Sequence, residues 1–499
     1  MPRFDSARDI VRFDLTTGTA RRLLGAGLAL GILFDLLRSD PPGLNATLWV
    51  LAMVAAAGTL RAGRFPAALA VAALFSLVFT WRGSELLFAL SVLAILASLV
   101  AGLVQRPSWS GLGAWVLAAV TGVASAIVGA VLGIGVAAKG APRPRGAWRI
   151  VVVGALGVIL AAPLLLILGS LFASADPLFA HTIRDFVRPL QEVAEHGGVV
   201  LAVAWLAGGG LVALAAIRVT RGPAIAAPAA GAAPVLVAVG LVGALFLLFL
   251  GVQARALFGG RAVVESTLGL SYAEYARQGF FQLVASCAVA LPPLLAADWA
   301  VPPGHRHRRR FIALAGALAL MVLLVLTSAA RRLALYVGEY GLTEDRLLAS
   351  AFLAWLALSS VVFALTVLRG ARERFAAGAL GSAAVVLGLL AVANPDALIV
   401  RTNLGLEGPP GFDAEYASRL GADAAPALVE ALPELEPADR CTVAASLLKK
   451  WGASEEDGWR SWNAGRWRAR AAVASARAEL ADAARGCYSA SPAAPIRRE

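Results

Sequence analysis

The feature that most constrains this chain is a succession of apolar runs, many of them close to 20 residues long, separated by short polar segments. A hydrocarbon core about 30 Å thick is crossed by about 20 apolar helical residues. Hydrophobic residues make up 59% of the chain and charged residues 15%, against about 45–50% and about 25% in a soluble domain. A soluble fold has too little interior to hide so much apolar surface, so the sequence predicts a protein embedded in a lipid bilayer.

The runs predict an all-α fold, a polytopic transmembrane helix bundle of about twelve spans with a range of about 11–13. After a charged N-terminal segment (1–22), the bundle is expected over 23–393, and a small, soluble helical region over 394–499. Small residues recur in the runs and let helices approach closely. The predicted spans are 23–37, 44–60, 65–80, 84–104, 110–137, 148–172, 197–217, 233–256, 279–297, 311–328, 347–368 and 375–393.

The net charge of +12 lies in the short segments before residue 394, because the C-terminal region holds slightly more acidic than basic residues. By the positive-inside rule the most basic loops face the cytoplasm, and the C-terminal region is then extracytoplasmic. These loops are Lys139–Arg149, Arg218–Arg221, His305–Arg310 and Arg369–Arg374. The Arg-rich N-terminus should also be cytoplasmic, which twelve spans do not allow, so we expect one miscounted span before Lys139. The sequence has no basic stripe interleaved with aromatic residues, so it does not predict a nucleic-acid partner.

Two polar segments predict interfacial helices. The first, near 176–196, begins at Asp176 and is amphipathic, and Asp176 is either a helix cap or part of a site with His181. The second, near 271–280, begins with a capping box made by Ser271 and Glu274. The polar side chains around this second start are either a well-capped helix end or a cluster at the mouth of the bundle: Tyr272, Glu274, Tyr275 and Arg277.

Two further polar segments are predicted at the membrane surface, an outward loop and the exit of the chain from the bilayer. The loop Arg331–Arg346 carries Tyr336 and Tyr340, which suit the aromatic belt at the membrane surface, and ends with Thr343 as a predicted N-cap. The segment Asn394–Asn403 follows the last apolar run at once, and its Arg401 is expected to contact headgroups or another outward loop.

The C-terminal region is punctuated by prolines, with Asp413 as a predicted helix cap. Tryptophan and arginine alternate between Trp451 and Arg470, which fits either a packed core with solvated arginines or a segment resting on lipid headgroups. If the region is extracytoplasmic, Cys441 and Cys487 lie in an oxidising compartment and are candidates for a disulfide.

The chain lacks the sequence patterns of known catalytic centres. HExxH, GxSxG and P-loop motifs do not occur, and no histidine or cysteine spacing resembles a metal site. The sequence therefore predicts no catalytic residue, no metal and no cofactor. Pro163 and the Pro292–Pro293 pair offer helix breaks of the kind that transporters use, but no charge accompanies them.

Five strings resemble, in their order and spacing, bacterial membrane proteins of the domain-of-unknown-function families 4153 and 4173. They are SADPLFA (174–180), LSYAEYARQGFFQL (270–283), LYVGEYGLTEDRL (335–347), NPDALIVRTN (394–403) and DAEYASRLGADAAPAL (413–428). The resemblance implies a multipass bacterial inner-membrane protein without an assigned activity. It nominates Asp176, Tyr272, Tyr275, Arg277, Tyr336, Tyr340, Asn394, Asp396, Arg401 and Asn403 as site candidates.

Three functional hypotheses follow. The first is a non-enzymatic envelope component that binds a protein partner, senses a signal or maintains the envelope. The second is a secondary transporter or flippase-like carrier, and the third is an integral-membrane enzyme acting on lipid or cell-wall intermediates through Asp176, Glu274 and Arg277. The lipid bilayer is the one partner that the sequence implies directly, and a small-molecule substrate stays unknown.

Overall fold

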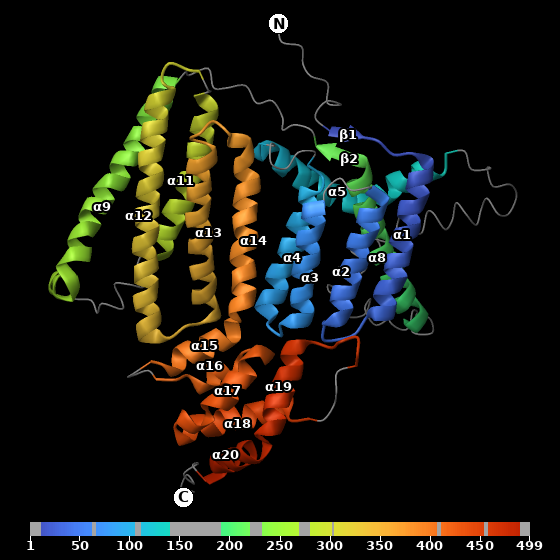
Figure 1. Cartoon of the computed structure of the whole chain (residues 1–499), viewed down its shortest axis with the longest axis vertical. Coiled ribbons are helices and arrows are strands. Elements are labelled where there is room, and N and C mark those ends of the chain that lie inside the picture. The colour runs from blue at the N-terminus through green and yellow to red at the C-terminus, as the bar shows by residue number, and fades with distance from the viewer. Residues whose placement is uncertain are drawn as a thin grey trace, which may run out of the picture.

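A computed structural model describes residues 11–61, 66–104, 111–139, 191–219, 232–268, 280–301, 304–406, 411–453 and 458–489. It shows a bundle of long helices with a smaller helical domain at one end (Figure 1). The bundle helices are α1 (Thr17–Leu37), α2 (Leu44–Arg61), α3 (Pro66–Trp81), α4 (Glu85–Ala101), α5 (Leu112–Ala137), α8 (Gln191–Ala216), α9 (Ala232–Leu268), α11 (Phe280–Ala300), α12 (Arg308–Tyr340), α13 (Glu344–Thr366) and α14 (Phe375–Ala393).

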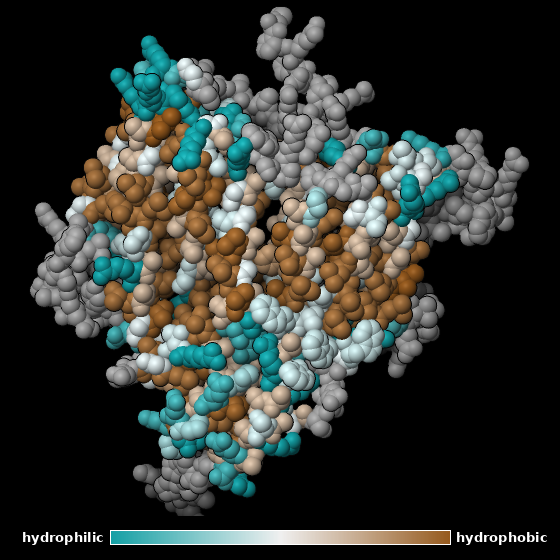
Figure 2. All heavy atoms as spheres, in the orientation of Figure 1, coloured by the Kyte–Doolittle hydropathy of each residue, from teal (hydrophilic) through white to brown (hydrophobic). Residues whose placement is uncertain are grey.

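On the face of the bundle shown in Figure 2, apolar side chains form a broad band, with hydrophilic residues at its upper edge and the domain below it. Within the described ranges, seven helices are long and apolar enough to cross a membrane, and α2, α3 and α4 are shorter apolar helices. Each predicted span except 148–172, which lies outside the described residues, coincides with a helix. The polytopic all-α membrane fold is therefore confirmed, and the number of twelve spans stays a prediction.

A two-stranded sheet ties the start of the chain to the end of α8. Strand β1 (Val11–Phe13) pairs antiparallel with β2 (Ile217–Val219), and an isolated bridge joins Val104 to Val219. Arg21, in the first turns of α1, donates from Nε to the carbonyl of Ala137 at 3.2 Å. Residues 11–13, 104, 137 and 219 therefore lie at one end of the bundle.

The same end of the bundle also receives the end of helix α5. Helix α5 packs along α8 and α1, and its last residue, Ala137, accepts the hydrogen bond from Arg21 near the start of α1. Helix α5 is one of the seven helices that are long and apolar enough to cross a membrane, so which span before Lys139 is miscounted stays a prediction.

Three buried clusters divide the bundle. One cluster joins α9 and α11–α14, and another joins α1, α2, α5 and α8. The third runs from α2–α4 through α14 into the C-terminal domain, with Phe75, Leu390 and Leu428 among its members. Helix α11 continues through Pro292 and Pro293, so the predicted break is not a break in the helix.

The C-terminal domain sits against the ends of α3, α4 and α12–α14 (Figure 1). Because the third cluster is continuous, the domain is packed on the bundle rather than tethered to it. It comprises α15 (Pro395–Leu404), α16 (Ala414–Arg419), the 3-10 turns η5 (Ala422–Ala424) and η6 (Leu432–Glu434), α17 (Ala425–Ala431), α18 (Pro437–Trp451), α19 (Ala464–Ser475) and α20 (Arg477–Ser489).

Two helices extend beyond the apolar runs that predicted them. Helix α12 extends to Tyr340, so the loop expected at Arg331–Arg346 shrinks to the turn before Glu344, and α9 extends to Leu268. Residues such as Ala, Leu and Arg have high helix propensity, which lets a helix continue past the apolar run that starts it. Thr343 and Asp413 cap the helices that follow them, as predicted, by accepting from Arg346 N and Tyr416 N.

Candidate functional site

The junction between the bundle and the C-terminal domain contains buried charged residues, and it begins with the α3–α4 turn. Arg82 in this turn is 7% exposed. Its Nε donates to the carbonyl of Ala391 at 2.8 Å, and its Nη2 donates to the carbonyl of Val392 at 3.0 Å. A cation beside the last carbonyls of a helix also compensates the negative end of the helix dipole, so Arg82 stabilises the C-terminal end of α14.

Asp423, in η5, is the countercharge of this turn. Its Oδ2 accepts from Gly83 N at 2.6 Å, and its Oδ1 lies 3.9 Å from Arg82 and 3.4 Å from Arg468. Burial raises the pKa of Asp423, while the Gly83 amide and the two arginines act in the opposite direction. Asp423 therefore joins the domain to the bundle through Gly83 and Arg82, and it also pairs with Arg468 of the domain itself.

Asp396 lies beside this network but is not satisfied by it. It is fully buried on α15, and neither carboxylate oxygen accepts a well-formed hydrogen bond from the described residues. Burial, followed by the nearby charges of Asp423 and Glu344, raises the pKa of Asp396 to about 7, although the Ser84 hydroxyl and the Gly421 amide lie close enough to lower it. Asp396 can therefore exchange a proton near neutral pH.

Glycine at position 421 makes room for this carboxylate. A Cβ atom there would lie 2.5 Å from Asp396 Oδ2 and 2.9 Å from the carbonyl of Gly83. Any larger side chain would displace either the carboxylate or the turn, so the close contact depends on Gly421.

Asn463 fastens α19 to the same turn. Its Nδ2 donates to the carbonyls of Phe79 (2.8 Å) and Arg82 (2.7 Å), while its Oδ1 accepts from Arg466 N and caps α19. Arg468 adds a bond to the carbonyl of Trp81 at 2.9 Å. Three carbonyls at and just after the end of α3 thus accept hydrogen bonds from side chains of the domain.

A second contact joins α15 to the α12–α13 turn. Asn403 accepts from Leu342 N at 2.6 Å and donates to the carbonyl of Leu342 at 2.9 Å, so one side chain satisfies both backbone groups. Glu344 N donates to the Tyr416 hydroxyl at 2.9 Å. The strings at 335–347, 394–403 and 413–428 therefore meet in space.

The remaining predicted site residues that the structure describes do not form one cluster. Tyr336 and Tyr340 lie on α12 with ring centroids 5.0 Å apart, and the Arg346 guanidinium lies 4.3 Å from the Tyr336 ring. Asn394 adopts a left-handed conformation (φ 57°) and caps α15. Arg401 lies 3.6 Å from Glu430 on the surface, so it contacts the domain itself. Asp176, Tyr272, Glu274, Tyr275 and Arg277 lie outside the described residues.

The predicted disulfide concerns α18 and α20, which pack along each other. Cys441 is buried on α18 and is disulfide-bonded. The side chain of residue 487 lies outside those described, so its pairing with Cys441 stays a prediction.

Sequence reasoning nominated Asp396 but missed Arg82, Asp423 and Asn463. A signal exists for each of them: Arg82 interrupts two apolar runs, Asp423 lies within the quoted string 413–428, and Asn463 precedes a helix as a cap. Among the residues that the structure describes, no group of three or more His, Cys, Asp or Glu side chains has the arrangement of a metal site. The junction combines the ion pairs of Asp423 with one buried carboxyl, Asp396, whose pKa is raised to about 7.

One comparison with known proteins matches a region of the chain that includes these segments. A family model described as "Domain of unknown function (DUF4153)" matches residues 69–431. The chain belongs to this family. The DUF4153 region runs from within α3 to the end of α17, so it contains Arg82, Asp396 and Asp423 but not Asn463. Neither the curated proteins nor the solved structures include a match to the chain.

Proposed function

We propose that this DUF4153 protein is a non-enzymatic component of the bacterial inner membrane that presents its C-terminal domain, in a fixed orientation, to a protein partner in the envelope. The observation that carries the proposal is the Arg82–Asp423–Arg468 network. It uses buried charge to hold the domain on the bundle, and breaking such a pair is costly. A rigid mount of this kind suits a surface that has to be displayed.

The charge distribution supports an extracytoplasmic position for the domain. Arg308, in the first turn of α12, donates to the carbonyl of Val367 at 3.2 Å, which brings the basic turns at 305–310 and 369–374 together. Both turns lie at the end opposite the domain, where the N-terminal strand also lies (Figure 1). By the positive-inside rule that basic end faces the cytoplasm.

Photo-crosslinking in intact cells tests the proposal. A photoreactive residue at exposed Thr442 on α18 should give one discrete cross-linked product in the wild type. Asp423→Ala, which releases the domain, should abolish the product, whereas the matched variant Glu430→Gln should retain it. Asp176→Asn and Glu274→Gln should also retain it.

The opposite pattern supports an enzyme. In that case removal of residues 404–499 would leave the protein's cellular role intact, while Asp176→Asn and Glu274→Gln would abolish that role. A flippase-like carrier is the other alternative, and an apolar cavity between the α1–α2 and α3–α4 hairpins is the observation that favours it.

A further inference from the structure

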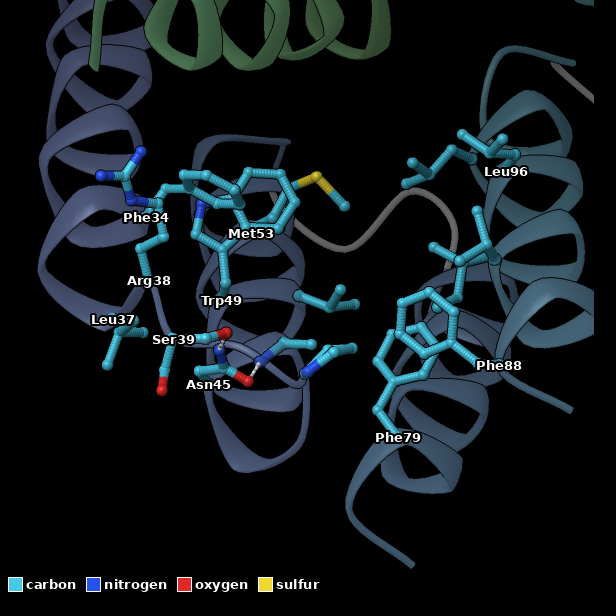
Figure 3. A pocket seen from close by; sticks show the side chains of 16 residues that line it. Phe34, Leu37, Arg38, Ser39, Asn45, Trp49, Met53, Phe79, Phe88 and Leu96 are labelled. Carbon is cyan, nitrogen blue, oxygen red and sulfur yellow. Dashed lines mark hydrogen bonds between the residues drawn. The ribbon is translucent and has the colours of Figure 1, made fainter. Parts of the chain in front are cut away.

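The α1–α2 and α3–α4 hairpins enclose an apolar slot of about 430 Å³. Phe34 and Trp49 of one hairpin face Phe79 and Phe88 of the other across it (Figure 3). The Trp49 indole donates to the carbonyl of Leu30 at 3.0 Å, so the ring is held in place and its polar group is satisfied. The walls of the slot are almost entirely apolar, so it suits an apolar chain rather than water.

The length and opening of the slot identify the kind of occupant. On α4 the lining runs from Phe88 to Leu99, a rise of about 16 Å at about 1.5 Å per residue. Half of a hydrocarbon core of about 30 Å is about 15 Å, the depth of one leaflet. Leu96 lines the slot and is also 53% exposed, so the slot opens sideways onto the lipid-facing surface.

The mouth of the slot is polar and basic. Arg38, Ser39 and Asn45 line it. The side chain of Asn45 already stabilises the α1–α2 turn, because it accepts from Gly43 N and donates to the Ser39 carbonyl. Asp35, one turn before Arg38, lies 2.9 Å from His196 instead. Arg38 is exposed and no carboxylate within the described ranges pairs with it, which makes its guanidinium the candidate group for an anion.

The C-terminal domain extends this mouth. Leu44 N and Asn45 N donate to the carbonyls of Trp462 (2.9 Å) and Arg460 (2.7 Å), which places the 458–466 segment on the α1–α2 turn. Trp459 and Trp462 are 60% and 40% exposed, and Arg460 lies against the Trp459 ring at 5.6 Å. Exposed tryptophan and arginine are favoured at lipid headgroups, and arginine binds phosphate through paired donors.

We propose that the slot binds one acyl chain of an anionic phospholipid, with the headgroup phosphate at Arg38 and beside Arg460. The chain fills the apolar walls to the depth of one leaflet, and the headgroup lies where the domain meets the bundle. This assignment is independent of any protein partner and uses none of the residues that hold the domain through Asp423.

The test uses the full-length protein in mild detergent and follows its thermal unfolding as lipid is added. Phosphatidylglycerol should raise the Tm with an apparent affinity about fivefold higher than that of phosphatidylcholine with the same chains, as one basic contact predicts. Arg38→Gln should remove this preference, whereas the matched variant Arg369→Gln, on an exposed turn at the opposite end, should keep it. Inorganic phosphate alone should cause no shift.

Two variants test the slot itself. Ala46→Phe fills it and Leu96→Trp blocks its side opening, so both should lose the response to either lipid. Ala55→Phe, on an exposed face of α2, is the control that should respond as the wild type does. An unchanged response in Arg38→Gln, Ala46→Phe and Leu96→Trp overturns the proposal, and so does a shift with inorganic phosphate equal to that with lipid.

Discussion

Two buried carboxyl groups at the junction have opposite surroundings. Asp423 accepts a backbone hydrogen bond and lies beside two guanidinium groups, so its charge is compensated. Asp396 is fully buried, lies near two other carboxylates and accepts no well-formed hydrogen bond among the described residues. The same residue type is therefore a structural anchor in one place and a proton-binding group in the other.

Asp396 should make stability depend on pH. Its pKa is about 7 in the folded protein against 3.8 for an ordinary carboxyl, so the folded state holds the proton more tightly than the unfolded state. The contribution of protonated Asp396 to the free energy of unfolding is complete below pH 4 and is lost as the pH rises towards 7. Above that pH the buried charge lowers the free energy of unfolding by up to about 4 kcal/mol.

Asp396→Asn should consequently be more stable than the wild type at pH 8, with a difference that shrinks towards pH 4. Thermal unfolding of both proteins in detergent across this range measures it. Parallel pH profiles for the two proteins would show that Asp396 does not titrate in this window.

Removing the charge of Asp423 should lower the stability of the folded protein, which is the opposite of the effect expected at Asp396. Asp423→Asn leaves the Arg82 guanidinium buried without its carboxylate, which costs about 3 kcal/mol. Glu430→Gln breaks the exposed pair with Arg401 and should cost less than about 1 kcal/mol. Hydrogen exchange at the start of α19 should accelerate strongly in the first variant alone, and equal exchange in both would contradict the assigned role of Asp423.

At the scale of elements, hydropathy located the helices and packing decided their paths. Helices α1 and α8 approach most closely through glycines. A Cβ atom at Gly31 would lie 2.4 Å from the carbonyl of Val200, and one at Gly27 would lie 2.6 Å from the Cα of Gly208. Close backbone approach of this kind is a general means of helix association in membranes.

Gly31→Leu should therefore separate α1 from α8 and destabilise the bundle by about 3 kcal/mol or more. Gly25, on the same helix, has no atom within 4 Å of an added Cβ, so Gly25→Leu should change the stability by less than about 1 kcal/mol. The Tm and the monodisperse fraction in detergent report the difference. Similar losses in both variants would indicate a general intolerance of α1 to leucine.

For the whole molecule, the proposed orientation across the membrane can be tested directly. In a Cys287→Ala background, Cys441 and Cys487 should react in intact cells with a membrane-impermeant thiol reagent only after reduction. That result follows if the C-terminal domain lies in an oxidising compartment with a disulfide. Labelling that needs cell lysis but no reductant would place the domain in the cytoplasm and reverse the proposed topology.

The sequence by itself determined the membrane class, the helical segments within the described ranges, the family and several helix caps. These properties depend on local composition, and a run of about 20 apolar residues has few alternatives to a helix in lipid. Thr343 and Asp413 could be recognised as caps because a cap depends on neighbours three residues away.

Only the tertiary structure decided the packing of α5 against α1 and α8, the docking of the C-terminal domain and the membership of the candidate site. Gly83 and Asp423 are 340 positions apart in the chain, and their contact exists because α3, α14 and η5 converge at one end of the bundle. The exposure of Trp459 and Trp467, at 60% and 61%, likewise favours the headgroup interpretation over a packed core. Burial and long-range pairing depend on how helices pack against one another, and a local sequence pattern does not specify that packing.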